Sequence, residues 1–213
     1  MKRSVLHYRQ LFLLDMNAVI RGMIVSDVVF MGSLGLLGPI FALFIVDFID
    51  GATPAVVGTA VAIFFLTKSL LQLPFASFID MVRGERDDFW ILVVGSAFTA
   101  CIPLLYLVIH TPAQLYLVQL LYGMATAATF PSYMAIYTRH IDRQKEGSEW
   151  GMYYMLTDFT SAITASLGGV LAQSLGFEPL IVIVVVGCLL GIGLLLPLRP
   201  YMRMPKKKHR RRL

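Results

Sequence analysis

The segment Pro179–Leu198, which reads PLIVIVVVGCLLGIGLLLPL, decides the class of fold. It carries no charged side chain and no hydroxyl group. At a rise of 1.5 Å per residue, a helix of about 20 residues crosses the hydrocarbon core of a bilayer, which is about 30 Å thick. Because lipid offers the backbone no hydrogen bonds, such a segment must satisfy its own as an α-helix. The segment therefore predicts a transmembrane helix.

Five more apolar segments of similar length precede it. The chain is 57% hydrophobic and 15% charged, with a mean hydropathy of +0.73, whereas a soluble domain needs more charge to cover its surface. We predict an all-α membrane protein with a cytoplasmic N-terminal segment (1–17), a six-helix transmembrane domain (18–198) and a basic cytoplasmic tail (199–213). The five segments are Ala18–Val46, Pro54–Ile79, Phe89–Ile109, Ala113–Tyr137 and Trp150–Ser174.

Lysine and arginine are confined to one side of this topology. The connections 47–54, 110–112 and 175–179 contain neither residue, while the other connections and both ends of the chain contain many. Cytoplasmic loops carry such an excess, so we predict that both termini lie on the cytoplasmic side of the plasma (inner) membrane. We expect the basic residues 206–212 to contact anionic lipid, with nucleic-acid binding as the less favoured alternative.

Three ionisable side chains lie well inside the predicted spans: Asp27, Lys68 and Asp158. A charge at the bilayer centre costs at least about 2.5–3.5 kcal/mol, which argues for a role. One interpretation is a Lys–carboxylate pair that fixes helix contacts. The other is a proton or ion relay, in which Asp27 is the first choice for the group that takes up and releases a proton. Gln72 lies four residues after Lys68 on the same helix face and is expected to hydrogen-bond within this cluster.

A polar and aromatic face runs along the fourth predicted helix, because its members recur at helical spacing. Bulky tyrosines fit a close helix contact poorly, so we predict a water-accessible substrate cavity, with helix packing as the alternative. The fifth helix carries a face of smaller residues, for which packing and cavity are equally favoured. The first face consists of Tyr122, Thr126, Thr129, Tyr133 and Tyr137, and the second of Thr157, Ser161, Thr164 and Gly168.

The sequence predicts neither an enzyme nor a bound cofactor or metal. Cys101 and Cys188 lie in separate apolar runs, which indicates no disulfide framework and no metal-ligand spacing. No Gly-x-Ser-x-Gly element or Ser–Lys pair suggests an intramembrane hydrolase.

The second predicted span ends in PFASFID (74–80), and MVRGER (81–86) follows. This stretch resembles the signature of the major facilitator superfamily between its second and third helices, where a small residue precedes an Asp by four and a basic-Gly-basic cluster follows. Ala76 stands where the family usually has Gly, Met81 replaces a basic residue, and the spacing is one residue longer. The resemblance implies a conformational latch, in which the carboxylate pairs with an arginine or a helix N-terminus. The latch residues are Asp80, Arg83, Gly84 and Arg86.

Two further features are similar to this superfamily. Gly32 with Pro39 in the first segment is echoed by Gly123 with Pro131 in the fourth. The echo fits two inverted three-helix repeats, the internal symmetry of each half of these proteins. The glycine-rich stretch 166–171 is similar to one that some antiporter members carry in the fifth helix.

Members of the superfamily usually have twelve helices in two halves, with substrate held between them. This resemblance covers 18–198 and amounts to one half, most like the N-terminal one. Because lipid would not tolerate an uncovered polar face, two parallel copies are expected to close the cavity. The resemblance implies a half-size secondary transporter working by alternating access. Asp27 indicates proton coupling, and the aromatic lining with few charges favours small amphiphilic, drug-like or sugar-like solutes. The alternatives are one half of a heterodimeric transporter, a non-transporting scaffold and a fragment without function.

Overall fold

The computed structural model describes residues 16–81 and 84–202. The stretch 1–15, Arg83 of the expected latch and residues 203–213 of the expected lipid-binding tail lie outside the described residues. The regular structure of the described chain is helical. In chain order it consists of α2 (Ala18–Gly35), α3 (Phe41–Phe48), α4 (Pro54–Met81), α5 (Glu85–Cys101), η1 (Ile102–Leu107), α6 (Pro112–His140), α7 (Glu146–Leu175), α8 (Phe177–Gly193) and η2 (Leu196–Tyr201).

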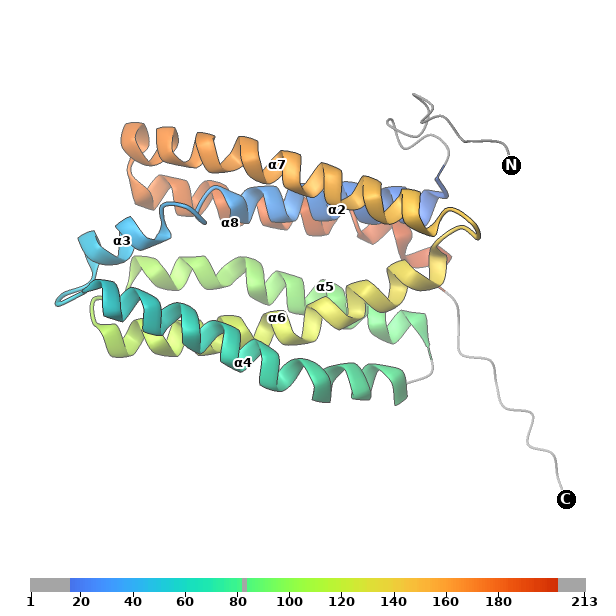
Figure 1. The fold of residues 1–213 in the computed structure, drawn as a ribbon, viewed down its shortest axis with the longest axis horizontal. Helices are drawn as coiled ribbons and strands as arrows, with labels where there is room; N and C mark the ends of the chain where they lie inside the picture. The colour runs from blue at the N-terminus through green and yellow to red at the C-terminus, as the bar shows by residue number, and fades with distance from the viewer. Residues whose placement is uncertain (1–15, 82–83, 203–213) are drawn as a thin grey trace, which may run out of the picture.

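Length and composition allow five of these elements to cross a membrane: α2, α4, α5 with η1, α7, and α8 with η2. The fourth predicted span corresponds to α6, which has 29 residues and runs along the bundle beside α4 and α5 (Figure 1). Its Gln, Tyr and Thr side chains lower its hydropathy, although its length suffices for a span. A six-helix membrane domain is compatible with this arrangement.

The first predicted segment is two helices rather than one. Pro39 has no amide hydrogen to donate to a helix, and α2 ends four residues before it, at Gly35. The chain resumes as the short helix α3 at the end of the bundle (Figure 1). Pro131, by contrast, is accommodated inside α6.

Helix contacts follow the pattern of two related three-helix units. α2 packs against α7 and α8, while α6 packs against α4 and α5, and the α2–α6 and α5–α8 contacts join the two sets. If α2, α4 and α5 are exchanged in order with α6, α7 and α8, the α2–α7 contact becomes the α6–α4 contact. The α2–α8 contact likewise becomes the α6–α5 contact. Figure 1 shows the two sets as separate layers, with α7 and α4 along opposite edges of the view.

Glycine permits the closest helix contacts in both layers. A Cβ added at Gly123 of α6 would lie 2.7 Å from the Phe64 carbonyl oxygen of α4. A Cβ at Gly168 of α7 would overlap the Leu36 carbonyl group just after α2. Thr160 and Thr164 of α7 likewise face the backbone of α2 at its glycines. The small-residue face predicted on the fifth helix therefore contributes to helix packing.

The two ends of the bundle differ in charge. The connections α4–α5 and α6–α7, the start of α2 and the end of η2 lie at one end (Figure 1). That end carries the arginine and lysine side chains described in or beside these connections: Arg86, Arg139, Arg143, Lys145 and Arg199. The structure therefore gathers the basic connections at a single end, as the topology predicted from the sequence requires.

Candidate functional site

A cavity of about 200 Å³ lies inside the bundle, between the two layers. All six long helices contribute to its wall. The wall combines one carboxylate, one ammonium group, several hydroxyls and apolar side chains. The lining residues are Ser26, Asp27, Phe30, Met31, Lys68, Leu92, Ser96, Thr126, Thr129, Phe130, Tyr133, Met134, Tyr153, Ile192 and Leu195.

Asp27 is the buried carboxylate of this cavity, with 8% of its surface exposed. Asn17 caps the start of α2, accepting a hydrogen bond from the Ile20 amide at 2.9 Å, so the helix begins there and carries Asp27 to the cavity wall. The Tyr153 hydroxyl of α7 donates a hydrogen bond to Asp27 Oδ2 at 2.8 Å. Within residues 16–81 and 84–202, no ion pair reaches this carboxylate.

Lys68 lies across the same cavity, on α4. Its Nζ is 5.2 Å from the ring centroid of Phe130, a cation–π distance, and its side chain is half-buried. Asp27 and Lys68 therefore share a cavity, and the described contacts do not join them as an ion pair. Gln72, one turn further along α4, is half-buried and does not line this cavity. Asp158 does not line it either, and its side chain is exposed on α7.

The tyrosine and threonine face of α6 is divided between different environments. Thr126, Thr129 and Tyr133 line the cavity that contains Asp27. Tyr137 is fully buried outside it, and its hydroxyl donates a hydrogen bond to the Glu149 carbonyl oxygen at 3.0 Å. The division follows from the neighbours of α6, because its last turns pack against the start of α7 while its middle faces open space.

Tyr122, the remaining member of that face, lines a second cavity of about 330 Å³. Its wall is apolar apart from Tyr106, Gln119 and Tyr122, and it contains no charged side chain. Gln119 Nε2 donates a hydrogen bond to the Tyr106 hydroxyl at 3.2 Å. This cavity lies near the end of the bundle that holds α3, away from Asp27.

Tyr153, Ser96 and Ser26 line the first cavity but were not predicted from the sequence. A signal for Tyr153 exists, since it lies four residues before Thr157 and so begins the polar face of the fifth helix. Ser26 and Ser96 offer no such pattern. The Ser26 hydroxyl donates to the Gly191 carbonyl oxygen at 2.7 Å, which is a common arrangement in packed membrane helices.

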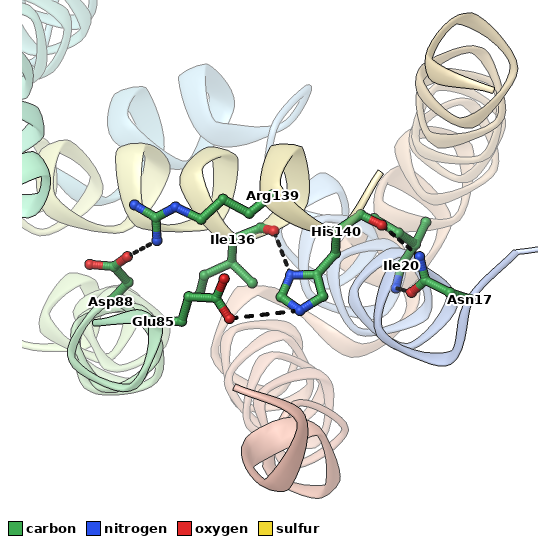
Figure 2. A network of polar contacts seen from close by, with 7 residues as sticks. All are labelled: Asn17, Ile20, Glu85, Asp88, Ile136, Arg139 and His140. Atoms are coloured by element: carbon green, nitrogen blue, oxygen red, sulfur yellow. Dashed lines mark hydrogen bonds and ion pairs between the residues drawn. The ribbon is translucent and has the colours of Figure 1, made fainter. Parts of the chain in front are cut away.

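A network of polar contacts closes the basic end of the bundle (Figure 2). Arg139 of α6 pairs with Asp88 of α5, and His140 Nε2 lies 3.7 Å from Glu85 Oε2. Asn17 Nδ2 donates to the His140 carbonyl oxygen at 2.6 Å. These contacts tie the starts of α2 and α5 to the end of α6. Acidic groups at a helix start and basic groups at a helix end also suit the helix dipoles.

The expected latch residues take separate positions at this end. Asp80 is exposed near the end of α4, and Gly84 immediately precedes α5 as its N-terminal cap. Arg86 is half-buried, and its Nε has no hydrogen-bond partner among the described residues. In the part of the chain that the structure describes, the ion pairs at this end use Asp88, Glu85 and Asp142 rather than Asp80.

Replacing Arg139 by methionine is expected to lower the free energy of unfolding by about 1–3 kcal/mol, because Asp88 is fully buried and would lose its cation. The Arg139 side chain is 35% exposed, so solvent screening keeps the loss below that of a fully buried pair. Adding Asp88→Asn is expected to recover most of the loss. Thermal unfolding in detergent compares the unchanged chain, the two single variants and the double variant, and so measures the coupling between Arg139 and Asp88. Additive losses of the two substitutions would contradict this coupling.

Long apolar helices around a polar internal cavity define the class of this molecule: it is a multi-pass integral membrane protein. The model of the Major Facilitator Superfamily matches residues 23–212, and the chain belongs to that superfamily. The POT family transporter PepTSo, solved in an in meso crystal structure, has a similar fold, with a TM-score of 0.61 and 18% sequence identity. The similarity covers 89% of this chain and 39% of that one, so the chain corresponds to less than half of that transporter. No curated protein matches the chain.

Proposed function

We propose that this protein is a secondary active transporter that moves small solutes by alternating access and couples their movement to protons through Asp27. The observation that carries the proposal is the position of this carboxylate. It lines an internal cavity, is buried, and is held by the neutral Tyr153 hydroxyl rather than by a cation. A carboxylate in such a place is suited to binding and releasing a proton as water enters and leaves.

The cavity wall suggests the class of solute. Thr126, Thr129, Tyr133 and Ser96 offer hydroxyl groups, while Phe30 and Phe130 offer apolar and aromatic surface. The wall contains one ammonium group, that of Lys68, and one carboxylate. This combination suits a small amphiphilic molecule, drug-like or sugar-like, better than one with several charges.

A second copy of the chain, parallel to the first in the membrane, would complete the cavity. α4 and α7 are the least buried of the candidate spans, and Asp158 is exposed on α7. Polar groups within a membrane normally face a protein interior or a water-filled cavity rather than lipid. A partner on these helices supplies such a setting. The membrane would be the plasma membrane, with the basic end of the bundle and both termini in the cytoplasm. The basic residues 206–212 would contact anionic lipid there.

Uptake by purified protein in liposomes tests the transport proposal. Glucose serves as a sugar-like solute and ethidium as a drug-like one, each measured with an imposed pH gradient in either direction. We expect accumulation of at least one solute above its external concentration, and loss of that accumulation when a protonophore collapses the gradient. Uptake that never exceeds equilibrium with either solute would count against proton coupling, and identical behaviour of empty liposomes would count against transport.

The glycine-rich part of α7 does not favour a scaffold role. That interpretation relied on this segment as a contact surface for other proteins. Gly168 already packs against the Leu36 backbone of the same chain, and the neighbouring threonines face α2. Gly168 and these threonines are therefore engaged inside the bundle. A chain that stays monomeric in nanodiscs would favour a hetero-pair with a different half-transporter over a homodimer.

A further inference from the structure

Lys68 and Asp158 are two charged side chains within the spans that have no ion-pair partner in the described chain. They belong to α4 and α7, which run along opposite edges of the bundle and are its least buried candidate spans (Figure 1). Lys68 is half-buried and Asp158 is exposed. An unpaired charge at this depth is costly in lipid, so each of these side chains requires a partner or water.

The two charges lie at similar depth. Lys68 precedes the end of α4 at Met81 by 13 residues, and Asp158 follows the start of α7 at Glu146 by 12 residues. At a rise of 1.5 Å per residue these separations are about 20 Å and about 18 Å. Both are measured from the same, basic end of the bundle (Figure 1). Two copies with parallel orientation would therefore hold these residues at one level.

Asp158 points away from its own bundle. The side of α7 that packs on α2 carries Tyr153, Thr160 and Thr164, while Met152 belongs to the buried core cluster and Leu156 packs against it. By helical geometry Asp158 lies more than 90° from both of these sides, and its neighbours Ser161 and Ala162 are also exposed. Small side chains on an exposed helix face allow another helix to approach closely.

A two-fold axis along the membrane normal allows two ways to cover these edges. Like edges could meet, with α4 on α4 or α7 on α7 of the second copy, which would oppose two like charges and leave the other edge uncovered. Unlike edges could meet instead, with α4 on the α7 of the second copy, which brings opposite charges together twice. Like charges directly opposed cost several kcal/mol, so charge complementarity selects the second arrangement.

We propose that two copies of this chain associate through α4 of one and α7 of the other, with Lys68 of each copy paired to Asp158 of its counterpart. The inference rests on the proposed function, since it specifies how the second copy completes the cavity. Lys68 lines the same cavity as Asp27. Asp158 of the second copy thus joins the rim of that cavity, and each transport site contains a residue from both chains.

A mixing experiment with reversed charges tests this contact. One variant carries Lys68→Asp and the other carries Asp158→Lys, each labelled with a different fluorophore and reconstituted into nanodiscs. Alone, each variant opposes two like charges across the interface, so we expect its self-association to fall at least about tenfold. Mixed, the two variants restore both opposite-charge pairs. We therefore expect mixed dimers to exceed the proportion found for two labels on the unchanged chain.

Neutral variants provide the matched control. In a mixture of Lys68→Gln with Asp158→Asn, no like charges are opposed and each mixed dimer keeps one Lys68–Asp158 pair, so its preference for mixed dimers should be smaller than that of the reversed-charge mixture. Because a reversed charge can prevent insertion, a second measurement uses Lys68→Cys in one copy and Asp158→Cys in the other. With Cys101→Ser in both, oxidative cross-linking is expected only when the two variants are mixed.

Each outcome decides a different point. The Lys68–Asp158 contact would be overturned if the reversed-charge variants self-associated like the unchanged chain, mixed randomly and gave no cross-link. Transport and dimerisation would then still stand. An unchanged chain that is monomeric in nanodiscs would overturn both the contact and the homodimer. Proton-driven uptake is measured separately, so its absence would refute the proposed transport without deciding how the copies meet.

Discussion

Liposomes that contain the Asp27→Asn variant are expected to take up solute only to equilibrium, whatever the direction of the pH gradient. The asparagine side chain has nearly the same shape and keeps an oxygen that accepts the Tyr153 hydrogen bond, found at 2.8 Å in the unchanged chain. It cannot bind and release a proton, so the proton gradient no longer drives the solute. Exchange of labelled for unlabelled solute at equal concentrations should persist, because exchange requires no net proton movement.

Tyr153→Phe is the matched control for this prediction. It removes the hydrogen bond to Asp27 but keeps the carboxyl group, so we expect slower uptake that still exceeds equilibrium. The measurement is the ratio of internal to external solute, together with the exchange rate, for the three proteins. If Asp27→Asn accumulated solute with an unchanged pH dependence, Asp27 would not be the coupling residue.

Gly168→Ala is expected to lower the unfolding temperature by about 5–10 °C, which corresponds to a loss of about 2–3 kcal/mol for a chain of this size. A Cβ at this position would overlap the Leu36 carbonyl group, which is backbone and cannot rotate away. α2 and α7 would have to separate, and the contacts of Thr160 and Thr164 with α2 would weaken.

The adjacent Gly169 offers a stringent control. A Cβ there meets no atom within 4 Å, so Gly169→Ala introduces the same methyl group into the same helix without a clash. Alanine has the higher helix propensity, and we expect this variant to unfold at the same temperature as the unchanged chain or slightly higher. Thermal unfolding in one detergent compares the three proteins directly. Equal losses for both variants would show that the close contact at Gly168 is not the cause.

Much of the fold was predictable because membrane helices are a local property of the sequence. Apolar length and the lack of alternatives for the backbone in lipid predict helices without knowledge of their neighbours. Breaks are less predictable: Pro39 interrupts the first segment, whereas Pro131 is held within α6. Both prolines remove one backbone donor, and only the surrounding helices decide whether the chain continues through the defect.

The sequence predicted how far along the spans the candidate site residues lie, but not which of them share a cavity. Counting along the helices places Asp27, Lys68 and Asp158 within the spans, and the structure brings the first two to one cavity while Asp158 faces outward. The face of α6 was continuous in the sequence, yet Tyr122 lines another cavity and Tyr137 is buried against the start of α7. Helical spacing specifies which residues share a face, and it contains no information on what that face meets.

The sequence by itself thus determined an all-helical membrane protein, the residues inside its spans and the segregation of its basic connections. These are consequences of hydrophobicity and helix geometry acting within single segments. Only the tertiary structure decided that Tyr153 holds Asp27, that Asp88 and Glu85 rather than Asp80 pair with basic side chains of α6, and that Gly168 meets the Leu36 backbone. Each of these contacts joins residues from different helices, and their pairing depends on how those helices rotate and cross when they pack.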